Sequence, residues 1–307
     1  MAPTEFQGTF APRDKRFTRL RSVSSAPWKA NFSFKTIMVI GAAIQTLVTL
    51  VLPRRYALFP FLAIFLHTVG TAIVRIATFD ARKPPVVPTT DHDAPVPDLT
   101  ASVIPSASYN PAKGETPFSK EVGKQQGVVA FHLSSRINHP LGNFAPGALD
   151  LLKYFEKGVQ ELMERADDYG CLGCSSWEGE TRQSQNTGLV VFYFRDVEGL
   201  HRFAHDKIHR EGWDWYWNFV KKQGYRHIGI NHETFYSPPG CWETINGDMP
   251  PTLLGAASVP VKNEATGQRE WVNTLVGAEN PKLRTQKARL GLLRQKGGVV
   301  DEKGVSY

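Results

Sequence analysis

Two long apolar runs come early in the chain, and shorter segments with strand and helix periodicity follow a polar, proline-rich stretch. The run at residues 34–52 is almost wholly apolar, and a second apolar run covers 56–79 after a short polar break. At the rise of an α-helix the first run reaches about 28 Å, enough to cross the hydrocarbon core of a bilayer. The pattern therefore predicts a transmembrane hairpin of two helices.

Two other structures can produce the same apolar runs. A cleavable signal peptide would lie at the extreme N-terminus, whereas 33 residues precede the first run and a second run follows it. A pair of buried core helices stays open as an alternative, because Lys35, Gln45 and Arg75 weaken the spans. Basic residues precede the first run and follow the second, which is the charge distribution of a hairpin with both ends in the cytosol. We therefore favour the hairpin.

Three further segments lack a clear periodic pattern. Residues 1–33 are basic and rich in Ser and Pro, which predicts a disordered tail. Residues 80–126 hold eight prolines in 47 positions, which favours an extended linker. Residues 251–307 are basic and weakly patterned, so we expect a mostly irregular tail, with a basic surface helix near its end as the alternative.

The segment 127–250 has the rhythm of a folded domain. Apolar and polar residues alternate in its first part, which is the pattern of a strand buried on one face. The order of elements, β-α-β-β-α-β, predicts an α+β, ferredoxin-like sandwich with a four-stranded antiparallel sheet and both helices on one face. The expected strands are 127–137, 171–178, 189–194 and 227–236, and the expected helices are 148–168 and 197–223.

The face of the predicted sheet away from the helices combines polar and apolar positions. Alternation in the first strand puts His132 and Arg136 on the side opposite to Val129, Phe131 and Leu133. A half-apolar exposed sheet tends to find a partner. We therefore hypothesise a homodimer whose sheets pack face to face and enclose a cavity.

The most informative segment for chemistry is the second predicted helix. Drawn as one continuous helix, it carries a core stripe through Leu200, Ala204, Ile208, Trp215 and Phe219. A second stripe, about a quarter-turn away, holds two imidazoles one turn apart beside two aromatic rings. Candidate catalytic residues are His205, His209, Trp213, Tyr216 and Glu233, and candidate substrate-binding residues are His132, Arg136, Asn138, Trp215 and His232.

Four interpretations of this stripe stay open. His205 and His209, at positions i and i+4, suit a metal if His232 or Glu233 supplies a third ligand. A haem needs one axial histidine in an apolar pocket. The two imidazoles also suit a small-molecule pocket in which they move protons, because histidine titrates near neutrality. The fourth interpretation is structural: half-exposed histidines beside packed tryptophans.

The last predicted strand also alternates, with His232 on one side and Glu233 on the other. One of these side chains faces the helices and the other faces the open side of the sheet, and periodicity leaves the assignment undecided. The predicted site can therefore lie on either face of the sheet, with His232 lining one face or Glu233 lining the other.

Charge, cysteine content and missing motifs narrow the classes of function. The net charge of +7 gathers near the apolar runs, and no basic stripe is interleaved with aromatics as in nucleic-acid binders. Three cysteines make no disulfide framework, and the lone CxxC at 171–174 lacks a second pair for zinc. The chain has no GxGxxG fingerprint, P-loop or GxSxG elbow. Any oxidation must use a borrowed cofactor, a metal or haem held by histidines, or electrons from the substrate.

The stretches FRDVEGLHRFAHDKIHREGWDWYW (194–217) and HIGINHETFYSPPGCWETINGDMPP (227–251) resemble a known family. Their order and spacing are similar to the fungal and bacterial monooxygenase-like proteins related to antibiotic-biosynthesis monooxygenases, which include membrane-bound members. The resemblance implies a dimeric α+β barrel that inserts an oxygen atom into a specialised metabolite, often a terpenoid or polyketide. Cofactor-free relatives imply roles for Trp213, Tyr216 and Asn138, and haem-binding relatives imply His209 as the axial ligand.

These observations lead to a membrane-bound fungal monooxygenase acting on an apolar specialised metabolite. The expected cofactor is unknown: either none, or haem. The expected partners are a small apolar substrate, a membrane and a second copy, with no nucleic acid. We expect two membrane helices with the catalytic domain in the cytosol, and the endoplasmic reticulum is a candidate membrane. The alternatives are a non-catalytic, membrane-tethered binder of a lipid-like ligand, and a dehydratase or isomerase on the same fold.

Overall fold

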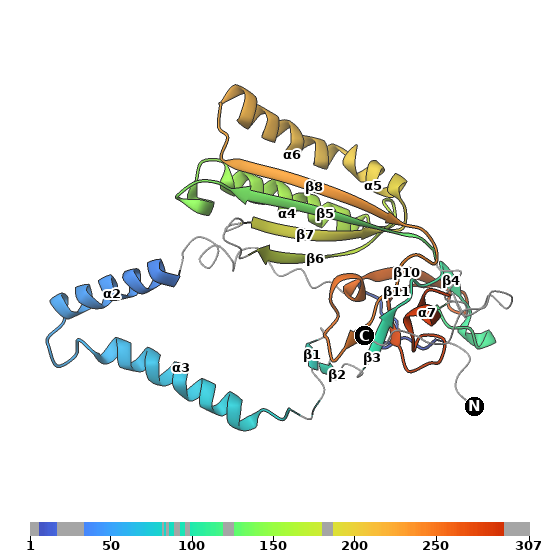
Figure 1. Ribbon diagram of the computed structural model, residues 1–307, viewed down its shortest axis with the longest axis horizontal. Helices are drawn as coiled ribbons and strands as arrows, with labels where there is room; N and C mark the ends of the chain where they lie inside the picture. Colours follow the sequence, from blue (N-terminus) through green and yellow to red (C-terminus); the bar gives the residue numbers. More distant parts are fainter. Residues whose placement is uncertain are drawn as a thin grey trace.

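The computed structural model describes residues 6–16, 34–81, 83, 86–88, 93–95, 99–118, 126–179 and 187–291. Figure 1 shows three parts: a helical hairpin, an α/β sandwich and a smaller lobe built mainly of strands. The parts of the predicted terminal tails and linker at 1–5, 17–33, 119–125 and 292–307 lie outside the described residues.

The sandwich has the predicted order of elements, β-α-β-β-α-β. Its four strands form one antiparallel sheet in the order β6-β7-β5-β8, with the first strand in the middle beside the last. This is the strand order of a ferredoxin-like fold. The elements are β5 (Val128–Ile137), α4 (Ala148–Glu164), β6 (Cys171–Gly179), β7 (Thr187–Phe194), α5 (Val197–Ala204), α6 (Lys207–Trp217), η5 (Asn218–Lys222) and β8 (Ile228–Ser237).

The helices cover one face of the sheet and bury an apolar core there (Figure 1). Val129 and Phe194 of the sheet and Leu162 of α4 are almost fully buried together in this core. Phe131 and Leu133 of β5 pack against the same cluster, as the alternation predicted. A second core lies at the far end of β5, where Ile137 and Ile228 meet residues of both helices.

The predicted second helix, 197–223, is two helices followed by a π-helical turn. The break comes at Asp206, whose extended backbone ends α5 and whose side chain accepts a hydrogen bond of 3.1 Å from the Ile208 amide as the N-cap of α6. A continuous helical wheel across 197–223 is therefore wrong. The phase of the side chains changes at Asp206 because a capping aspartate competes with helix continuation.

A β lobe occupies sequence that was predicted to be linker and tails. Its strands form two three-stranded sheets, β11-β10-β4 and β12-β3-β9. Phe6, Val103, Val259 and Val276 lie in its buried core. The lobe contains β3 (Leu99–Ser102), β4 (Ser108–Tyr109), η2 (Pro111–Lys113), β9 (Asn246–Gly247), η6 (Leu253–Ala256), β10 (Ser258–Asn263), β11 (Arg269–Asn273), β12 (Leu275–Gly277) and α7 (Gln286–Arg289).

The structure thus differs from three predicted segments. Residues 6–16 are part of the β lobe, since the Thr9 amide donates to Leu275 O at 2.8 Å and Arg13 bridges to Trp271. Residues 99–118 contribute β3 and β4 instead of an extended linker, and 251–291 contribute β10, β11, β12 and α7. These strands are short, and apart from the β10–β11 hairpin they pair across long sequence separations, so they leave little periodic signal in the sequence. A further short pair, β1 (Val86–Pro88) and β2 (Asp93–Pro95), is antiparallel.

The β lobe covers one end of the sheet face that was predicted to be open. Leu172, Val128 and Tyr193 of the sheet pack into the lobe core. A Cβ built on Gly173 would lie 3.0 Å from the Cα atom of Ala257, so the two parts approach closely there. The face is therefore only partly available to a second copy, and the face-to-face dimer stays a prediction.

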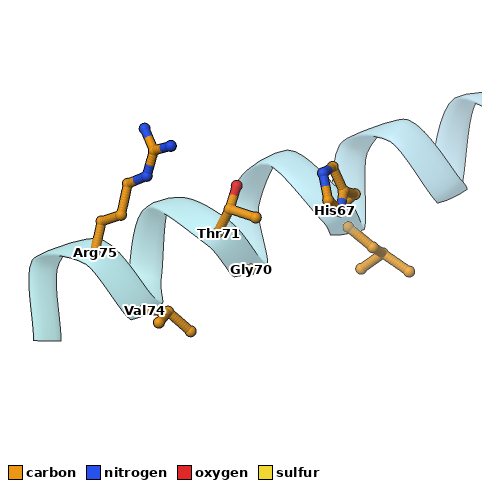
Figure 2. A pocket seen from close by; sticks show the side chains of 6 residues that line it. His67, Gly70, Thr71, Val74 and Arg75 are labelled. Atoms are coloured by element: carbon orange, nitrogen blue, oxygen red, sulfur yellow. The ribbon is translucent and has the colours of Figure 1, made fainter. Parts of the chain in front are cut away.

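The hairpin consists of α2 (Phe34–Val51) and α3 (Phe59–Thr78), which extend away from the rest of the chain (Figure 1). α3 is long and apolar enough to cross a membrane, whereas the apolar part of α2 at Lys35–Val51 falls short by the same measure. One hydrogen bond joins α2 to the turn before α3: Gln45 Nε2 donates to Ala57 O at 2.9 Å. Figure 2 shows an open hollow along α3 whose lining comes from this helix alone: Leu66, His67, Gly70, Thr71, Val74 and Arg75.

Candidate functional site

The sheet divides the predicted site residues into two groups. In β5 and β8, Leu133 pairs with His232 and His132 pairs with Glu233. Since Leu133 packs into the helix-side core, His232 lies on the helix side and Glu233 lies on the opposite face with His132. The helix-side group is His205, His209, Trp213, Trp215, Tyr216 and His232, and the opposite group is His132, Arg136, Asn138 and Glu233.

His209 is the best-defined member of the helix-side group. Its Nδ1 atom lies 2.9 Å from Ala204 O, and its ring meets the edge of Phe203 at a centroid distance of 5.6 Å. A carbonyl can only accept, so Nδ1 carries the proton and Nε2 keeps its lone pair. Burial lowers the pKa of His209 below its ordinary value of 6.5, and His232 and His205 lower it further. The result is a neutral imidazole with a free basic nitrogen near pH 7.

Three aromatic rings continue the wall beyond His209. Trp213 stacks on Tyr216 at 6.0 Å and meets Trp217 edge-on at 5.4 Å. The Tyr216 hydroxyl donates to Ile228 O at 3.4 Å, which ties this part of α6 to β8. Trp213 is 45% exposed, so this wall is open to solvent on one side. An apolar molecule has large flat surfaces to lie against here.

His205 does not join His209 as a metal-binding pair. It ends α5 with its own Nδ1 2.8 Å from His201 O, and the break at Asp206 separates it from α6. In the parts of the chain that the structure describes, no group of three or more His, Cys, Asp or Glu residues could hold a metal ion. The interpretation of His205 and His209 as an i, i+4 metal pair assumed an unbroken helix, and the described residues do not provide one.

A network around Asp206 holds the break in place. Its carboxylate accepts hydrogen bonds from Tyr169 at 2.8 Å and from Arg165 at 3.1 Å. The Tyr169 hydroxyl and the Ile208 amide are the main causes of the lowered pKa of Asp206, with Arg165 adding to them. Sequence analysis missed these residues, although an Asp at position 206 before a helical repeat is a recognisable N-cap signal. The network matters because it sets the direction in which His209 points.

Trp215 lies in the core between the helices and not at the aromatic wall. It stacks on Phe219 and packs against Tyr154 of α4, each at a centroid distance of 5.4 Å. Its predicted contact with substrate is not supported by this position. The sequence already contained the reason, since Trp215 falls on the apolar stripe.

The opposite face carries a more exposed polar cluster. His132 Nδ1 lies 3.8 Å from Glu233 Oε2, with the two side chains 36% and 62% exposed. The His132 ring also contacts Phe235 at 5.4 Å, and Ser134 is hydrogen-bonded to Asn231 beside it. Arg136 Nε is buried without a hydrogen-bond partner among the described residues. These groups make a polar strip along β5 and β8.

Asn138 lies with this second group. Its Nδ2 atom is 3.6 Å from a Cβ built on Gly229, which pairs with Arg136 in the sheet. It follows the end of β5 and is exposed. The trio of Asn138, Trp213 and Tyr216 that the family resemblance implied is therefore not assembled at one place.

The Cys-Leu-Gly-Cys segment is part of β6. All three cysteines are free, and Cys171 and Cys174 both pack in the helix-side core. Burial raises the pKa of the Cys171 thiol to about 11 and that of Cys174 to about 12. The raised pKa favours the protonated thiol for both residues at neutral pH.

Comparison with solved structures finds only distant likeness. A crystal structure of aldoxime dehydratase matches with a TM-score of 0.32 and 11% identity over 48% of this chain and 36% of that chain. The match thus spans about a third of the aldoxime dehydratase. SnoaB, a cofactor-independent oxygenase from Streptomyces nogalater, matches with a TM-score of 0.25 and 12% identity over 35% of this chain and 90% of that one. Likeness this low carries no argument about chemistry.

Comparison of the sequence is far more specific. The profile of the Monooxygenase af470-like family matches residues 128–254, which contain the whole sandwich. Monooxygenase af470 of Aspergillus fumigatus is 38% identical over 262 residues, covering 85% of this chain and 88% of that protein. The 262 aligned residues are about twice the 127 residues of the family profile, so the similarity to this relative extends beyond the sandwich. The chain therefore belongs to the Monooxygenase af470-like family of fungal monooxygenases.

Proposed function

We propose that this monooxygenase is membrane-bound and oxidises an apolar specialised metabolite, of terpenoid or polyketide type, on the helix side of its sheet. The observation that carries the proposal is His209: a half-buried, neutral imidazole whose Nδ1 is held by Ala204 O. Its free Nε2 atom is suited to take a proton from a bound substrate. His232 of β8 and the rings of Trp213 and Tyr216 are the neighbouring groups that we assign to binding.

The simplest balanced reaction takes its electrons from the substrate. His209 Nε2 removes a proton from an activated CH₂ group, and the carbanion reduces O₂. One oxygen atom then replaces the two hydrogens as C=O and the other leaves as water, so that CH₂ + O₂ gives C=O + H₂O. The protein supplies the base and an apolar wall against which the substrate lies. No external reductant is required in this scheme.

Haem is the alternative cofactor. His209 would be the residue to hold it, since its Nε2 atom lies on a ring next to the apolar ring of Phe203. A bound haem would supply the oxygen-activating chemistry, and the rest of the wall would bind substrate. An ultraviolet–visible spectrum of the purified full chain separates the two schemes: a Soret band moves His209 to the role of ligand, and a colourless protein supports its role as base.

The connectivity of the β lobe supports a hairpin with two crossings. Residues 6–16 and residues from Leu99 onward belong to the same folded lobe, on either side of the hairpin. The number of membrane crossings between them must therefore be even. An even number means that α2 and α3 either both cross or both stay on one side. α3 is long and apolar enough to cross, and the 18 residues of α2 reach about 27 Å, so we propose that both cross.

Free cysteines support a cytosolic position for the catalytic part, because buried thiols are typical of reducing compartments. The topology is tested by introducing Arg54→Cys, in a Cys241→Ser background, and labelling intact microsomes with a membrane-impermeant maleimide. Two crossings put residue 54 on the lumenal side, so labelling should need permeabilisation. Labelling of intact vesicles at residue 54 would instead favour a hairpin that lies in the cytosolic leaflet.

The activity is tested on the reconstituted full chain under ¹⁸O₂, with dithranol, which has an activated CH₂ group, as a polyketide probe of the cofactor-free scheme and farnesol, which has none, as a terpenoid probe of the haem scheme. A product carrying one ¹⁸O atom supports the proposal. A probe that binds without oxygen-dependent turnover would indicate a ligand-binding protein. Loss of water, or isomerisation without O₂, would indicate the acid–base alternative.

A further inference from the structure

One end of the sandwich carries an apolar and basic surface that the proposed reaction does not use. Two connections and the adjoining helix ends build it: residues 138–147 between β5 and α4 with the first turn of α4, and residues 218–227 between α6 and β8 with Trp217 at the end of α6. Leu141, Phe144 and Leu149 are each more than half exposed. We define the end patch as Leu141, Phe144, Leu149, Trp217, Lys221, Lys222, Tyr225 and Arg226.

The two connections form one preformed surface. His227 Nε2 lies at hydrogen-bond distance, 2.8 Å, from Pro146 O, and Phe219 stacks on Tyr225 at 4.9 Å. Gly147 has a positive φ of 76°, and a Cβ there would lie 2.4 Å from the Phe219 ring. The loops are therefore locked together, and their exposed apolar side chains do not arise from a loose segment.

The charges of the end patch complement an anionic surface. Lys221, Lys222 and Arg226 are exposed, and Lys221 Nζ lies 4.6 Å from the Trp217 ring. Among the acids whose side chains the structure describes near the patch, Asp150 lies 3.7 Å from Lys153 and Asp214 on α6 is exposed. Tryptophan and tyrosine beside lysine and arginine is the composition of segments that lie at the boundary between lipid headgroups and acyl chains.

The end patch is continuous with the candidate site. Trp217 contacts Trp213 at 5.4 Å and Tyr216 at 5.8 Å, so the aromatic wall beside His209 extends into it. In Figure 1 the hairpin projects to the same side of the molecule as the end where β5 finishes and β8 begins. The end patch therefore lies on the side of the molecule where a bilayer would hold the hairpin (Figure 1).

We propose that the end patch docks on the anionic surface of that bilayer and lets a membrane-dissolved substrate reach the aromatic wall without crossing water. The proposal rests on the membrane-bound function proposed above. Leu141, Phe144 and Leu149 enter the interface, and Lys221, Lys222 and Arg226 contact lipid phosphates or carboxylates. Anionic lipid attraction and buried apolar area act together in such docking.

The test uses the full chain in nanodiscs of phosphatidylcholine and phosphatidylserine, with the exposed Cys241 replaced by serine. A nitrobenzoxadiazole label is placed at Leu141→Cys and, as the matched control, at Glu198→Cys on α5 at the opposite end of the sheet. Brominated acyl chains should quench the label at residue 141 by a factor of about two or more, since docked apolar residues reach the acyl boundary. The label at residue 198 should be almost unaffected.

A second comparison tests the charges. Combining Lys221→Glu, Lys222→Glu and Arg226→Glu should reduce the quenching at residue 141, whereas Lys207→Glu at the start of α6 should leave it unchanged. Equal quenching at residues 141 and 198 overturns the proposal. Protection of residue 141 from iodide without quenching by brominated lipid, in discs that hold two chains, would assign the end patch to a second copy instead.

Carbonate extraction of microsomes that contain the full chain separates the docking proposal from the membrane anchor on which it rests. Release of the chain by carbonate would contradict the membrane anchor itself. Retention of the chain, with residue 141 unquenched, would contradict only the docking of the end patch.

Discussion

The two faces of the sheet carry similar residues in different surroundings. On the helix face, His209 is half-buried, with one nitrogen held by a backbone carbonyl and a pKa lowered by burial. On the other face, His132 lies 3.8 Å from a carboxylate that is 62% exposed. The comparison teaches that a fixed hydrogen bond and removal from water, rather than residue type, distinguish a candidate base from a solvated ion pair.

The largest expected effect comes from replacing the two histidines separately. His209→Ala should lower kcat by about 10²–10⁴-fold, because it removes the general base. His132→Ala is the matched control and should change kcat by less than about tenfold, since an exposed pair contributes little to a positioned proton transfer. Oxygen-dependent product formation measures both, with circular dichroism to check folding. A greater loss at His132 would move the site to the other face.

On the sheet face opposite to the helices, side chains that the β lobe covers should contribute more to the free energy of unfolding than side chains that it leaves exposed. Leu172→Ala should lower the free energy of unfolding by about 2–5 kcal/mol, because Leu172 is 1% exposed where the β lobe covers the sheet. Phe235→Ala, at a position more than half exposed on the same face, should cost less than half as much. Urea unfolding of the full chain in detergent measures both. Equal losses would mean that the lobe does not seal this end of the sheet.

The pH dependence of turnover sharpens the comparison further. Because burial lowers the pKa of His209, its neutral form persists below its ordinary pKa of 6.5. The acid limb of the kcat profile should therefore have its midpoint below pH 6.5, with activity lost as pH falls through the lowered pKa and retained above it. A midpoint above pH 6.5 would argue against His209 as the base.

The smallest expected effect is that of the ion pair on the second face. Glu233→Gln should change the free energy of unfolding by no more than about 1 kcal/mol, because both partners are partly exposed and water screens their attraction. Urea unfolding at low and high salt provides the measurement. A loss well above that value would reveal a buried role for Glu233 that its exposure does not suggest.

The sandwich was predictable because its signals are local. The alternation of Val129, Phe131 and Leu133 with His132 and Arg136 identified β5 and its core face, and the structure agrees. The same reasoning could not assign the faces of β8. Whether His232 or Glu233 meets the helices depends on register with β5, which is a contact between distant segments.

The candidate site was predictable only in part. Trp213 and Tyr216 stack on each other in α6, the helix that also carries His209, whereas His205 ends α5 and Trp215 packs in the core. A helical wheel assumes an unbroken helix, and Asp206 interrupts it. The interruption is held by Tyr169 and Arg165, which are about 40 residues away in the sequence.

By itself the sequence determined the apolar hairpin, the order of strands and helices in the sandwich, and the histidine- and tryptophan-rich segment that carries the candidate site. These follow from composition and periodicity, which neighbouring residues encode. Only the tertiary structure decided the faces of β8, the break at Asp206 and the existence of the β lobe. Contacts such as Thr9 with Leu275 join residues far apart in the chain, and short strands paired in that way leave no local pattern.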